Sequence, residues 1–254
     1  MPRPCYVLRV FTRRGEGGNP LGVVTDVTGL GARTMQRIAA DLNFSETVFL
    51  DWRDTEHPSV RIFTPTTELT FAGHPLVGTA WLLNTLGPGG PGHLCCPAVE
   101  VVTMTDQDGD CWIDAPLSWP VTSASAFGWP AAIATHFVEM SHPYLLVELP
   151  DPGQVAAVQT TEYGWTYLYS WEGPNTIKAR FFAAGGGIEE DAATGSAAVA
   201  LAALWTWQGR DQGAIEINQG DEMGRPSTIR LRWGAGRSAI GGAVVKDEVR
   251  WLDV

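Results

Sequence analysis

The sequence predicts an α+β fold in two pseudo-symmetric lobes, each a curled, mostly antiparallel β-sheet or barrel around a central buried helix. The main observation is that two segments repeat one pattern, a glycine-rich turn that leads directly into a run of small apolar residues, at residues 71–83 (FAGHPLVGTAWLL) and 191–205 (DAATGSAAVALAALW). Both runs are apolar on nearly every face, which is typical of a helix buried on all sides. A Rossmann layout, with amphipathic helices outside the sheet, fits this pattern less well.

The order of the predicted elements also repeats along the chain. In the first half, two strands, a helix and two further strands precede the first apolar helix, at residues 6–11, 21–25, 32–42, 46–50 and 60–63. In the second half, a strand, a short helix and two strands precede the second apolar helix, at residues 144–148, 151–158, 165–171 and 177–182. Further strands are expected at residues 214–218, 227–233 and 244–249.

The connections between these elements follow from glycine and proline, which favour turns. We expect a turn at Asn19-Pro20, a loop at residues 86–92 and the linker between the lobes at residues 116–130. The N-terminal lobe is then expected at residues 1–117, joined by a C-terminal strand at about 243–254, and the C-terminal lobe at residues 118–242.

The composition of the 254-residue chain argues against several kinds of partner. A formal net charge of -11 at pH 7 disfavours nucleic acid, whose phosphates need a basic face, and an anionic membrane surface. Because the N-terminus shows no signal peptide and no apolar run is long enough to span a bilayer, we expect a cytoplasmic protein. The four cysteines, at positions 5, 95, 96 and 111, lack C-x-x-C spacing, and the histidines lack the spacing of zinc ligands, so we expect reduced structural thiols and no metal site.

The start of each apolar helix is a candidate anion site. The first backbone N–H groups of a helix have no partner within the helix, and the helix dipole places partial positive charge there. A carboxylate can bind to such donors. Two buried helix starts in one chain therefore predict a small acidic ligand held between two halves.

Three polar residues beside these segments are candidates for chemistry. Glu46 opens an apolar strand next to residues such as Val48 and Phe49, and such surroundings raise a carboxyl pKa towards neutrality, where the group can both take and give a proton. His74 and Asp191 each lie beside an apolar helix start. Each residue alone has an ordinary interpretation, as an edge glutamate, a helix-start histidine or an N-cap aspartate. Their positions beside elements expected to share one cleft favour a joint catalytic role.

Five motifs, taken in order, resemble the PhzF-like phenazine-biosynthesis isomerase family over essentially the whole chain. They are Asn19-Pro20 and residues 45–49 (SETVF), 72–75 (AGHP), 191–197 (DAATGSA) and 219–227 (QGDEMGRPS). The resemblance implies a diaminopimelate-epimerase-like fold with the active site in the cleft between its lobes, and a homodimer. It also implies an isomerase without a cofactor, which moves a proton on a small, carboxylate-bearing unsaturated or amino-acid-derived metabolite by one-base catalysis.

The resemblance assigns a role to each matching residue. Glu46 corresponds to the family's proton-shuttling glutamate, and His74 and Asp191 correspond to its assisting polar residues. The positions that bind substrate, largely through backbone donors at the helix starts, are Asn19, Ser45, Gly73, Thr194, Gly195, Ser196, Gln219 and Gly220.

Two features of the chain qualify the resemblance. Ala192 stands where the family usually has proline, which changes the rigidity of that turn. Diaminopimelate and proline epimerases of this fold use one thiol at each helix start, but the corresponding residues here are Ala72 and Thr194. One-base transfer on a single face is therefore favoured over two-base racemisation by thiols.

Two other functions remain open at this point. A non-catalytic small-molecule binding protein on the same fold would keep the helix-start donors and have no use for Glu46. A related enzyme of another secondary-metabolite pathway would carry out an isomerisation or a C–C bond hydrolysis of the alkylproline type. The sequence argues against a serine hydrolase and a P-loop, because Ser196 lies outside a G-x-S-x-G motif and no G-K-[ST] follows Gly185-Gly186-Gly187.

Overall fold

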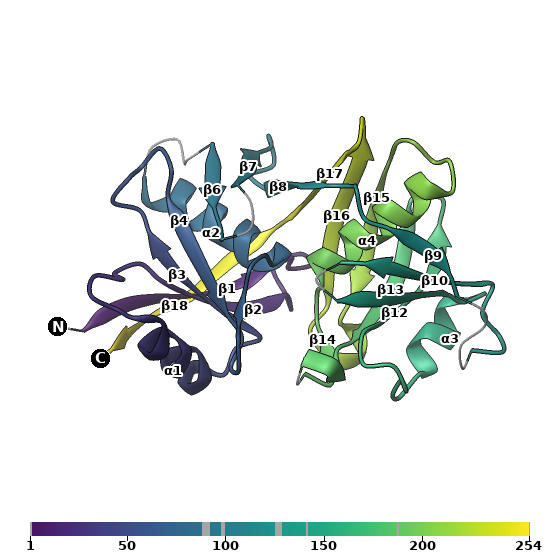
Figure 1. The fold of residues 1–254 in the computed structure, drawn as a ribbon, viewed down its shortest axis with the longest axis horizontal. Helices are drawn as coiled ribbons and strands as arrows, with labels where there is room; N and C mark the ends of the chain where they lie inside the picture. Colours follow the sequence, from purple (N-terminus) through teal and green to yellow (C-terminus); the bar gives the residue numbers. More distant parts are fainter. Residues whose placement is uncertain are drawn as a thin grey trace. The chain divides into compact units, whose positions relative to one another are not determined.

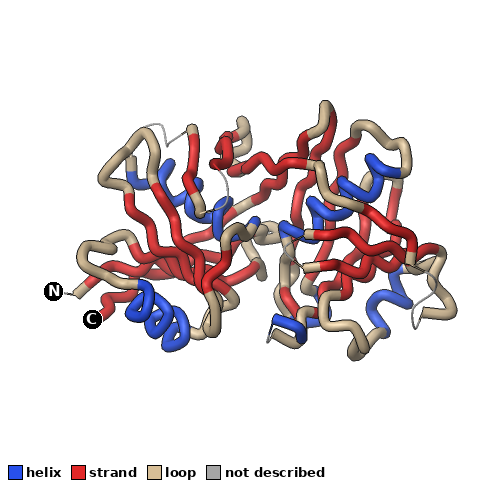
Figure 2. The backbone as a smooth tube through the Cα atoms, viewed as in Figure 1, coloured by secondary structure: helices blue, strands red, loops and turns tan. Residues whose placement is uncertain are grey.

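The computed structural model of the protein describes residues 2–87, 92–97, 100–124, 129–140, 142–186 and 188–253. Strands make up most of the regular structure (Figure 2). The chain divides into two compact units, the first made of Met1–Asp114 with Gly241–Val254 and the second of Ala115–Ile240. Each unit combines helices with a mostly antiparallel set of strands, as expected for an α+β protein.

The first unit begins with a ladder that joins both ends of the chain. β1 (Arg3–Val10) pairs antiparallel with β2 (Asn19–Val24) and with β18 (Val244–Leu252), as Figure 1 shows. α1 (Ala32–Leu42) then leads to β3 (Glu46–Asp51), which lies parallel to β2. β4 (Ser59–Phe63) pairs antiparallel with β3 and with the two-residue β5 (Glu68–Leu69). After α2 (Gly73–Leu86), the remaining strands are β6 (His93–Cys95), β7 (Glu100–Thr105) and β8 (Cys111–Pro116).

The second unit builds the same kind of ladder. β10 (Ala134–Glu139) pairs antiparallel with β9 (Val121–Ser123) and β11 (Pro143–Glu148). α3 (Pro152–Ala157) leads to β12 (Thr166–Gly173), which lies parallel to β11. β13 (Thr176–Phe182) pairs antiparallel with β12 and with the two-residue β14 (Glu190–Asp191). The other elements are the 3₁₀ turns η1 (Ala184–Gly186) and η2 (Asp221–Met223), α4 (Gly195–Trp207), β15 (Gly213–Gln219), β16 (Ser227–Gly234) and β17 (Arg237–Gly242).

The two units repeat one connectivity. In each, the two parallel pairings are made by a crossover through a helix: β2 to β3 through α1 and β4 to β6 through α2 in the first unit, and β11 to β12 through α3 and β13 to β15 through α4 in the second. Parallel neighbours need such a crossover, whereas antiparallel neighbours can be joined by a turn. The repeated order of elements read from the sequence is thus present in the strand pairing.

The predicted apolar helices are buried as expected. Ten of the 14 residues of α2 and ten of the 13 residues of α4 are buried. α2 contacts β1, β2 and β3, and α4 contacts β10, β11 and β16. Gly78 allows α2 to approach its strands closely, because a Cβ atom there would lie 2.6 Å from Cδ2 of Leu21 and 2.8 Å from Cγ2 of Val10.

The two outer helices follow their sequence patterns. α1 buries only Met35, Ile38 and Ala39, whose spacing forms one face, and it ends at Asn43 in the left-handed conformation with φ 53°. α3 begins after Asp151, whose Oδ1 accepts a hydrogen bond of 3.0 Å from the Gln154 backbone N–H. Both predicted helices are therefore confirmed.

Two predicted connections differ in the structure. Asn19 and Pro20 do not form a turn: they are the first residues of β2 and pair with Val10 and Arg9. Proline is tolerated there because the start of a strand can lack one ladder N–H donor. Residues 116–130 contain β9, so they are not only a linker. Several predicted loop residues lie outside the described part of the chain: residues 88–91 of the expected loop at 86–92, residues 125–128 and Gly187.

Candidate active site

One group of predicted site residues comes together in the first unit from three separate segments. Glu46 begins β3, with Ser45 just before it, and Asn19 begins β2. Parallel pairing aligns Leu21 with Glu46, so both strands start at the same end of the ladder. His74 lies in the first turn of α2, which packs against the same strands.

The side chains of this group form a chain of polar contacts. Ser45 Oγ donates to Asn19 Oδ1 at 3.1 Å, and Asn19 Nδ2 lies 3.3 Å from His74 Nδ1. On the other side of the ring, His74 Nε2 lies 3.4 Å from Glu46 Oε2. That distance exceeds a typical N–H···O hydrogen bond, and these two atoms do not hydrogen-bond to each other. The structure thus brings together Asn19, Ser45, Glu46 and His74, next to Gly73.

His74 is a buried neutral imidazole. Its side chain is 4% exposed, and burial lowers the pKa of His74 from 6.5 to about 3, while a hydrogen bond to the Pro20 backbone acts in the opposite direction. Its polar neighbours are the Asn19 side-chain amide, whose nitrogen lies beside Nδ1, and the Pro20 carbonyl, which can only accept a hydrogen bond. His74 therefore places a neutral ring nitrogen, rather than a full positive charge, beside Glu46.

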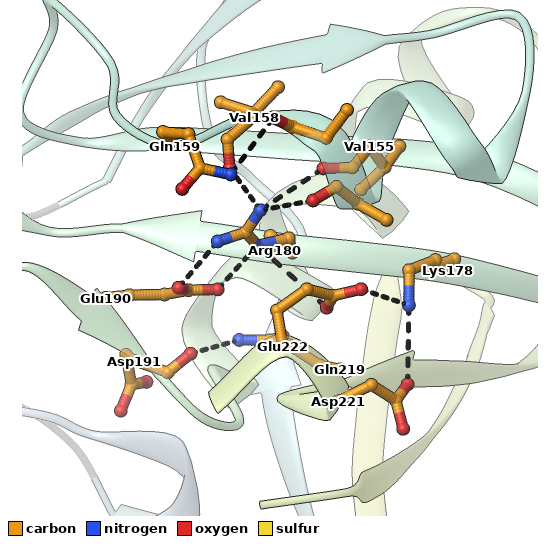
Figure 3. A network of polar contacts seen from close by, with 12 residues as sticks. Val155, Val158, Gln159, Lys178, Arg180, Glu190, Asp191, Gln219, Asp221 and Glu222 are labelled. Atoms are coloured by element: carbon orange, nitrogen blue, oxygen red, sulfur yellow. Dashed lines mark hydrogen bonds and ion pairs between the residues drawn. The ribbon is translucent and has the colours of Figure 1, made fainter. Parts of the chain in front are cut away.

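A second group of predicted residues comes together in the second unit. Thr194 Oγ1 donates to Asp191 Oδ2 at 2.6 Å. Gln219 Nε2 donates to the Asp191 backbone oxygen at 2.8 Å and to Thr194 Oγ1 at 3.1 Å, and the first of these bonds is drawn in Figure 3. The Gln219 side chain, buried at 1% exposure, therefore ties the end of β15 to the turn that precedes α4.

Gly220 follows Gln219 at a position that only glycine fits. Its φ is +82°, and a Cβ atom would lie 2.4 Å from the Arg225 backbone oxygen and 2.7 Å from the Ala192 backbone oxygen. Ala192 itself is 1% exposed in the same turn. Ala192, where the resemblance leads one to expect proline, is thus a packed residue of this turn.

Both apolar helices begin without a side-chain cap. The N-cap residues are Ala72 for α2 and Thr194 for α4, and among the described residues neither N-cap side chain bonds a backbone N–H of its helix. The Thr194 hydroxyl is directed to Asp191 instead, so Asp191 belongs to β14 and supports the N-cap rather than serving as one. The backbone donors at both helix starts are suited to an anion.

Two tyrosines that no sequence motif marks support the second group. The Tyr144 hydroxyl lies 3.1 Å from Ser196 Oγ, in the first turn of α4, and the Tyr167 hydroxyl donates to Gln219 Oε1 at 3.5 Å. Both tyrosines lie in apolar strands and are at most 5% exposed. A buried tyrosine hydroxyl needs a polar partner, which is the one property of these residues that could have marked them.

The thiols lie away from the helix starts in the chain. Ala72 and Thr194 occupy the two N-cap positions, so neither N-cap is a cysteine. Burial raises the pKa of Cys5 to about 12 and also raises the pKa values of Cys95 and Cys111. These three groups are therefore protonated at neutral pH and are poor general bases.

Comparison with known proteins identifies the family. Residues 8–128 and 130–245 match PhzC-PhzF, the phenazine biosynthesis-like proteins. The chain belongs to this family. The trans-2,3-dihydro-3-hydroxyanthranilate isomerase of Pseudomonas chlororaphis is 32% identical over 249 residues, which cover 89% of this chain and 88% of that protein. The resemblance stated from the motifs is confirmed, and this PhzF-like chain is an enzyme of the isomerase class.

Solved structures agree with this assignment at the level of the fold. The PhzF-family phenazine biosynthesis protein of Enterococcus faecalis matches with a TM-score of 0.83 at 22% identity, over 100% of both chains. A probable proline racemase from Agrobacterium radiobacter K84 matches with a TM-score of 0.69 at 11% identity, over 99% of this chain and 93% of that one. Within the described part of the chain, no helix is long and apolar enough to cross a membrane, and no three His, Cys, Asp or Glu side chains are grouped to hold a metal ion.

Proposed function

We propose that this PhzF-like enzyme is a cofactor-independent isomerase in which Glu46 takes a proton from one carbon of a small carboxylate and returns it to another. The observation that carries the proposal is the contact of Glu46 Oε2 with Nε2 of a neutral His74 at 3.4 Å. The Glu46 side chain is 15% exposed, so it is largely shielded from bulk water but still reachable. A general acid–base needs both properties.

The reaction balances without a cofactor. The Glu46 carboxylate takes the proton of a C–H bond next to an unsaturated system, and the electron pair of that bond moves into the system and shifts its double bond. The Glu46 carboxylic acid then gives the proton to the carbon at the far end of the shifted system. The product is an isomer of the substrate, and Glu46 is a carboxylate again. His74 Nε2 lies beside this carboxylate, and a proton on that nitrogen would stabilise the carboxylate before and after the transfer.

We propose that backbone N–H groups at a helix start bind the substrate carboxylate; the candidates are Gly73 in the first unit, and Gly195 and Ser196 in the second. Each start combines backbone donors that have no partner within the helix with the positive end of the helix dipole. Asp191 would repel an anion, but the hydrogen bond from Thr194 Oγ1 disperses its charge. Asp191 then serves as an acceptor for a polar group of the substrate.

The substrate class is drawn from the relatives. Because the Pseudomonas relative is named for trans-2,3-dihydro-3-hydroxyanthranilate, we propose a cyclic, unsaturated amino acid of this type as the substrate. A metabolite of an alkylproline-type pathway is the alternative. We further propose a cytoplasmic homodimer, for which the support is the family resemblance, and light scattering on the purified protein would measure its mass.

Turnover in heavy water tests the proposal. With trans-2,3-dihydro-3-hydroxyanthranilate, NMR should show formation of an isomer by the wild-type enzyme. Glu46→Gln should lower turnover by roughly 10²–10⁴-fold, because an amide cannot exchange the proton, and should keep its affinity for the aromatic analogue 3-hydroxyanthranilate. Glu100→Gln, at a half-exposed glutamate on β7, is the matched control and should not change turnover.

Two results would contradict the proposal. Near wild-type turnover by Glu46→Gln would remove Glu46 from the reaction. Binding of 3-hydroxyanthranilate by a wild-type protein that neither isomerises the dihydro compound nor exchanges its C–H protons for deuterium would favour a binding protein on the same fold.

A further inference from the structure

An arginine–glutamate ion pair precedes the apolar helix in each unit. In the first unit, Arg61 of β4 pairs with Glu68 of β5 through contacts of 2.7 Å from Nε to Oε1 and 2.7 Å from Nη2 to Oε2. In the second, Arg180 of β13 pairs with Glu190 of β14 through the corresponding contacts of 2.7 Å and 2.8 Å. Both pairs are bidentate, the geometry that fixes direction as well as distance.

The two pairs are built in the same way. In each, the glutamate faces a phenylalanine in the strand ladder, at Phe63↔Glu68 and Phe182↔Glu190. Each arginine also lies over the ring of that phenylalanine, at 5.2 Å from Phe63 and 4.8 Å from Phe182. Each glutamate stands five residues before the glycine that begins the helix, Gly73 or Gly195. The same device therefore leads into both candidate anion sites.

The pair in the second unit is the more deeply buried one. The side chains of Arg180 and Glu190 are 6% and 12% exposed, against 36% and 34% for Arg61 and Glu68. Figure 3 shows Arg180 at the centre of a polar network, where its Nη1 also donates to backbone oxygens of Val155, Ala156 and Val158 at the end of α3. The guanidinium is thus held from several sides and cannot rotate without losing these bonds.

A second cation on β13 holds the other segment of the site. Lys178 lies two residues before Arg180, on the same face of the strand, and its Nζ is 2.8 Å from Glu222 Oε1 and 3.5 Å from Asp221 Oδ2. Asp221 and Glu222 belong to η2, which directly follows Gly220. β13 therefore holds β14 through Arg180 and holds the turn after Gln219 through Lys178. Gln219 also links that turn to β14, because its Nε2 donates to the Asp191 backbone oxygen (Figure 3).

The side-chain direction of Glu190 determines the side-chain direction of Asp191, the next residue of β14. Successive side chains of a strand point to opposite faces, so Glu190 facing Arg180 requires Asp191 to face away from it. Figure 3 shows the Asp191 carboxylate directed away from Arg180. On that side, Asp191 Oδ2 receives the 2.6 Å hydrogen bond from the Thr194 N-cap hydroxyl.

We infer that Arg180 and Glu190 are positioning residues of the enzyme. By holding β14, they set the direction of the Asp191 carboxylate and the conformation of the turn that presents the N–H groups of Gly195 and Ser196. Arg61 and Glu68 have the corresponding role for Gly73 and His74. This inference deepens the proposed function and rests on it for its effect on turnover.

Conservative variants of the buried pair test this role. Arg180→Lys keeps the charge but loses the bidentate fork, and Glu190→Gln keeps the shape but loses the charge. Arg53→Lys is the matched control, because Arg53 makes a bidentate pair with Asp51 at the far end of β3, with a 74% exposed side chain. For each folded variant we would measure kcat and KM with trans-2,3-dihydro-3-hydroxyanthranilate, and amide hydrogen exchange at residues 191–196.

The expected result is a loss of kcat on the order of 10- to 100-fold for both Arg180→Lys and Glu190→Gln, since small displacements of positioned groups have such effects. KM should change less than kcat, and exchange at residues 191–196 should become faster while exchange within α4 stays slow. The double variant should be no worse than the more affected single one, because both changes act through one contact. Arg53→Lys should match the wild type in every measurement.

The inference is overturned if the variants lower only the thermal stability and leave kcat and exchange at residues 191–196 at wild-type values, which is the behaviour of a purely structural ion pair. Should Arg180→Lys fail to fold, kcat and exchange at residues 191–196 of Glu190→Gln decide the question alone. Failure of the proposed function has a different pattern: Glu46→Gln would keep its turnover, while faster exchange at residues 191–196 in Arg180→Lys would still show that the pair holds the turn.

Discussion

The amide nitrogen Nδ2 of Asn19 lies 3.3 Å from Nδ1 of His74, and Nε2 of the same ring faces Glu46 Oε2 at 3.4 Å. The imidazole thus lies between a neutral amide and a carboxylate, and both the asparagine and the histidine are buried. Because burial lowers the pKa of His74 to about 3, the folded protein holds this ring uncharged at neutral and mildly acidic pH. This relationship makes the stability of the protein depend on pH.

We predict that His74 lowers stability as the pH falls below its ordinary pKa. Between about pH 6.5 and pH 3, the unfolded chain binds a proton at this ring and the folded chain does not. The free energy of unfolding should therefore decrease by up to about 1.4 kcal/mol per pH unit through this window, and His74 should contribute no pH dependence above it. Urea unfolding of the wild type and of His74→Gln from pH 7.5 to pH 4 would measure the difference.

The control for this experiment is His57→Gln, since the His57 side chain is 57% exposed. Its stability should follow the pH dependence of the wild type. The buried His136, whose pKa burial also lowers, is present in all three proteins and cancels in the comparison. Parallel curves for the wild type and His74→Gln would show that His74 is not held neutral by the fold.

We predict that Asn19 acts on turnover through His74. Asn19→Leu keeps the approximate size of the side chain but removes the donor to His74 Nδ1 and the acceptor of Ser45 Oγ. Leaving buried polar partners unsatisfied costs about 1–3 kcal/mol of stability, and loss of the contact that orients the His74 ring should also lower kcat. Thr79→Val is the control: it removes a buried hydroxyl that donates to the Pro75 backbone oxygen in α2, and its kcat should stay near the wild-type value.

Sequence patterns predicted this site to different degrees. The apolar helices α2 and α4 and the bounds of α1 were predictable because burial leaves a periodic pattern in the chain. The turn expected at Asn19-Pro20 was wrong because asparagine and proline also fit the start of a strand, where Pro20 follows a glycine-rich turn. The arginine–glutamate pairs had no such pattern, since Arg180 and Glu190 meet only after β13 and β14 have paired.

We predict that the thiols are dispensable for catalysis. Replacing Cys5 and Cys111 by alanine and Cys95 and Cys96 by serine should leave kcat per folded molecule within about a factor of two, because Ala72 and Thr194 occupy the helix-start positions. Stability should fall, since Cys5 and Cys111 are fully buried and their removal leaves small cavities. A large loss of kcat traced to one cysteine in a folded variant would indicate thiol chemistry.

We predict that Gly220 and Gly224 tolerate alanine very differently. Both have positive φ, +82° and +66°, which costs a non-glycine residue about 1–2 kcal/mol. At Gly224 a Cβ would meet nothing within 4 Å, whereas at Gly220 it would press on the backbone oxygens of Arg225 and Ala192. Gly220→Ala should therefore lose roughly 1–3 kcal/mol more than Gly224→Ala in urea unfolding. Equal losses would mean that the Ala192 turn moves aside easily.

We predict that a carboxylate occupies a helix start when a ligand is bound. In a crystal structure with 3-hydroxyanthranilate, its carboxylate should accept hydrogen bonds from backbone N–H groups at the start of α2, of α4 or of both, because neither N-cap side chain bonds an N–H of its helix in the described residues. One ring carbon should lie within reach of Glu46. A substitution tests the same site. Gly195→Pro removes one backbone donor at the start of α4 and should weaken binding of 3-hydroxyanthranilate. Gly224→Ala, three residues beyond Asp221, should leave this binding unchanged. A carboxylate bound only by surface arginines, with both helix starts unoccupied, would contradict the anion site and the substrate orientation that depends on it.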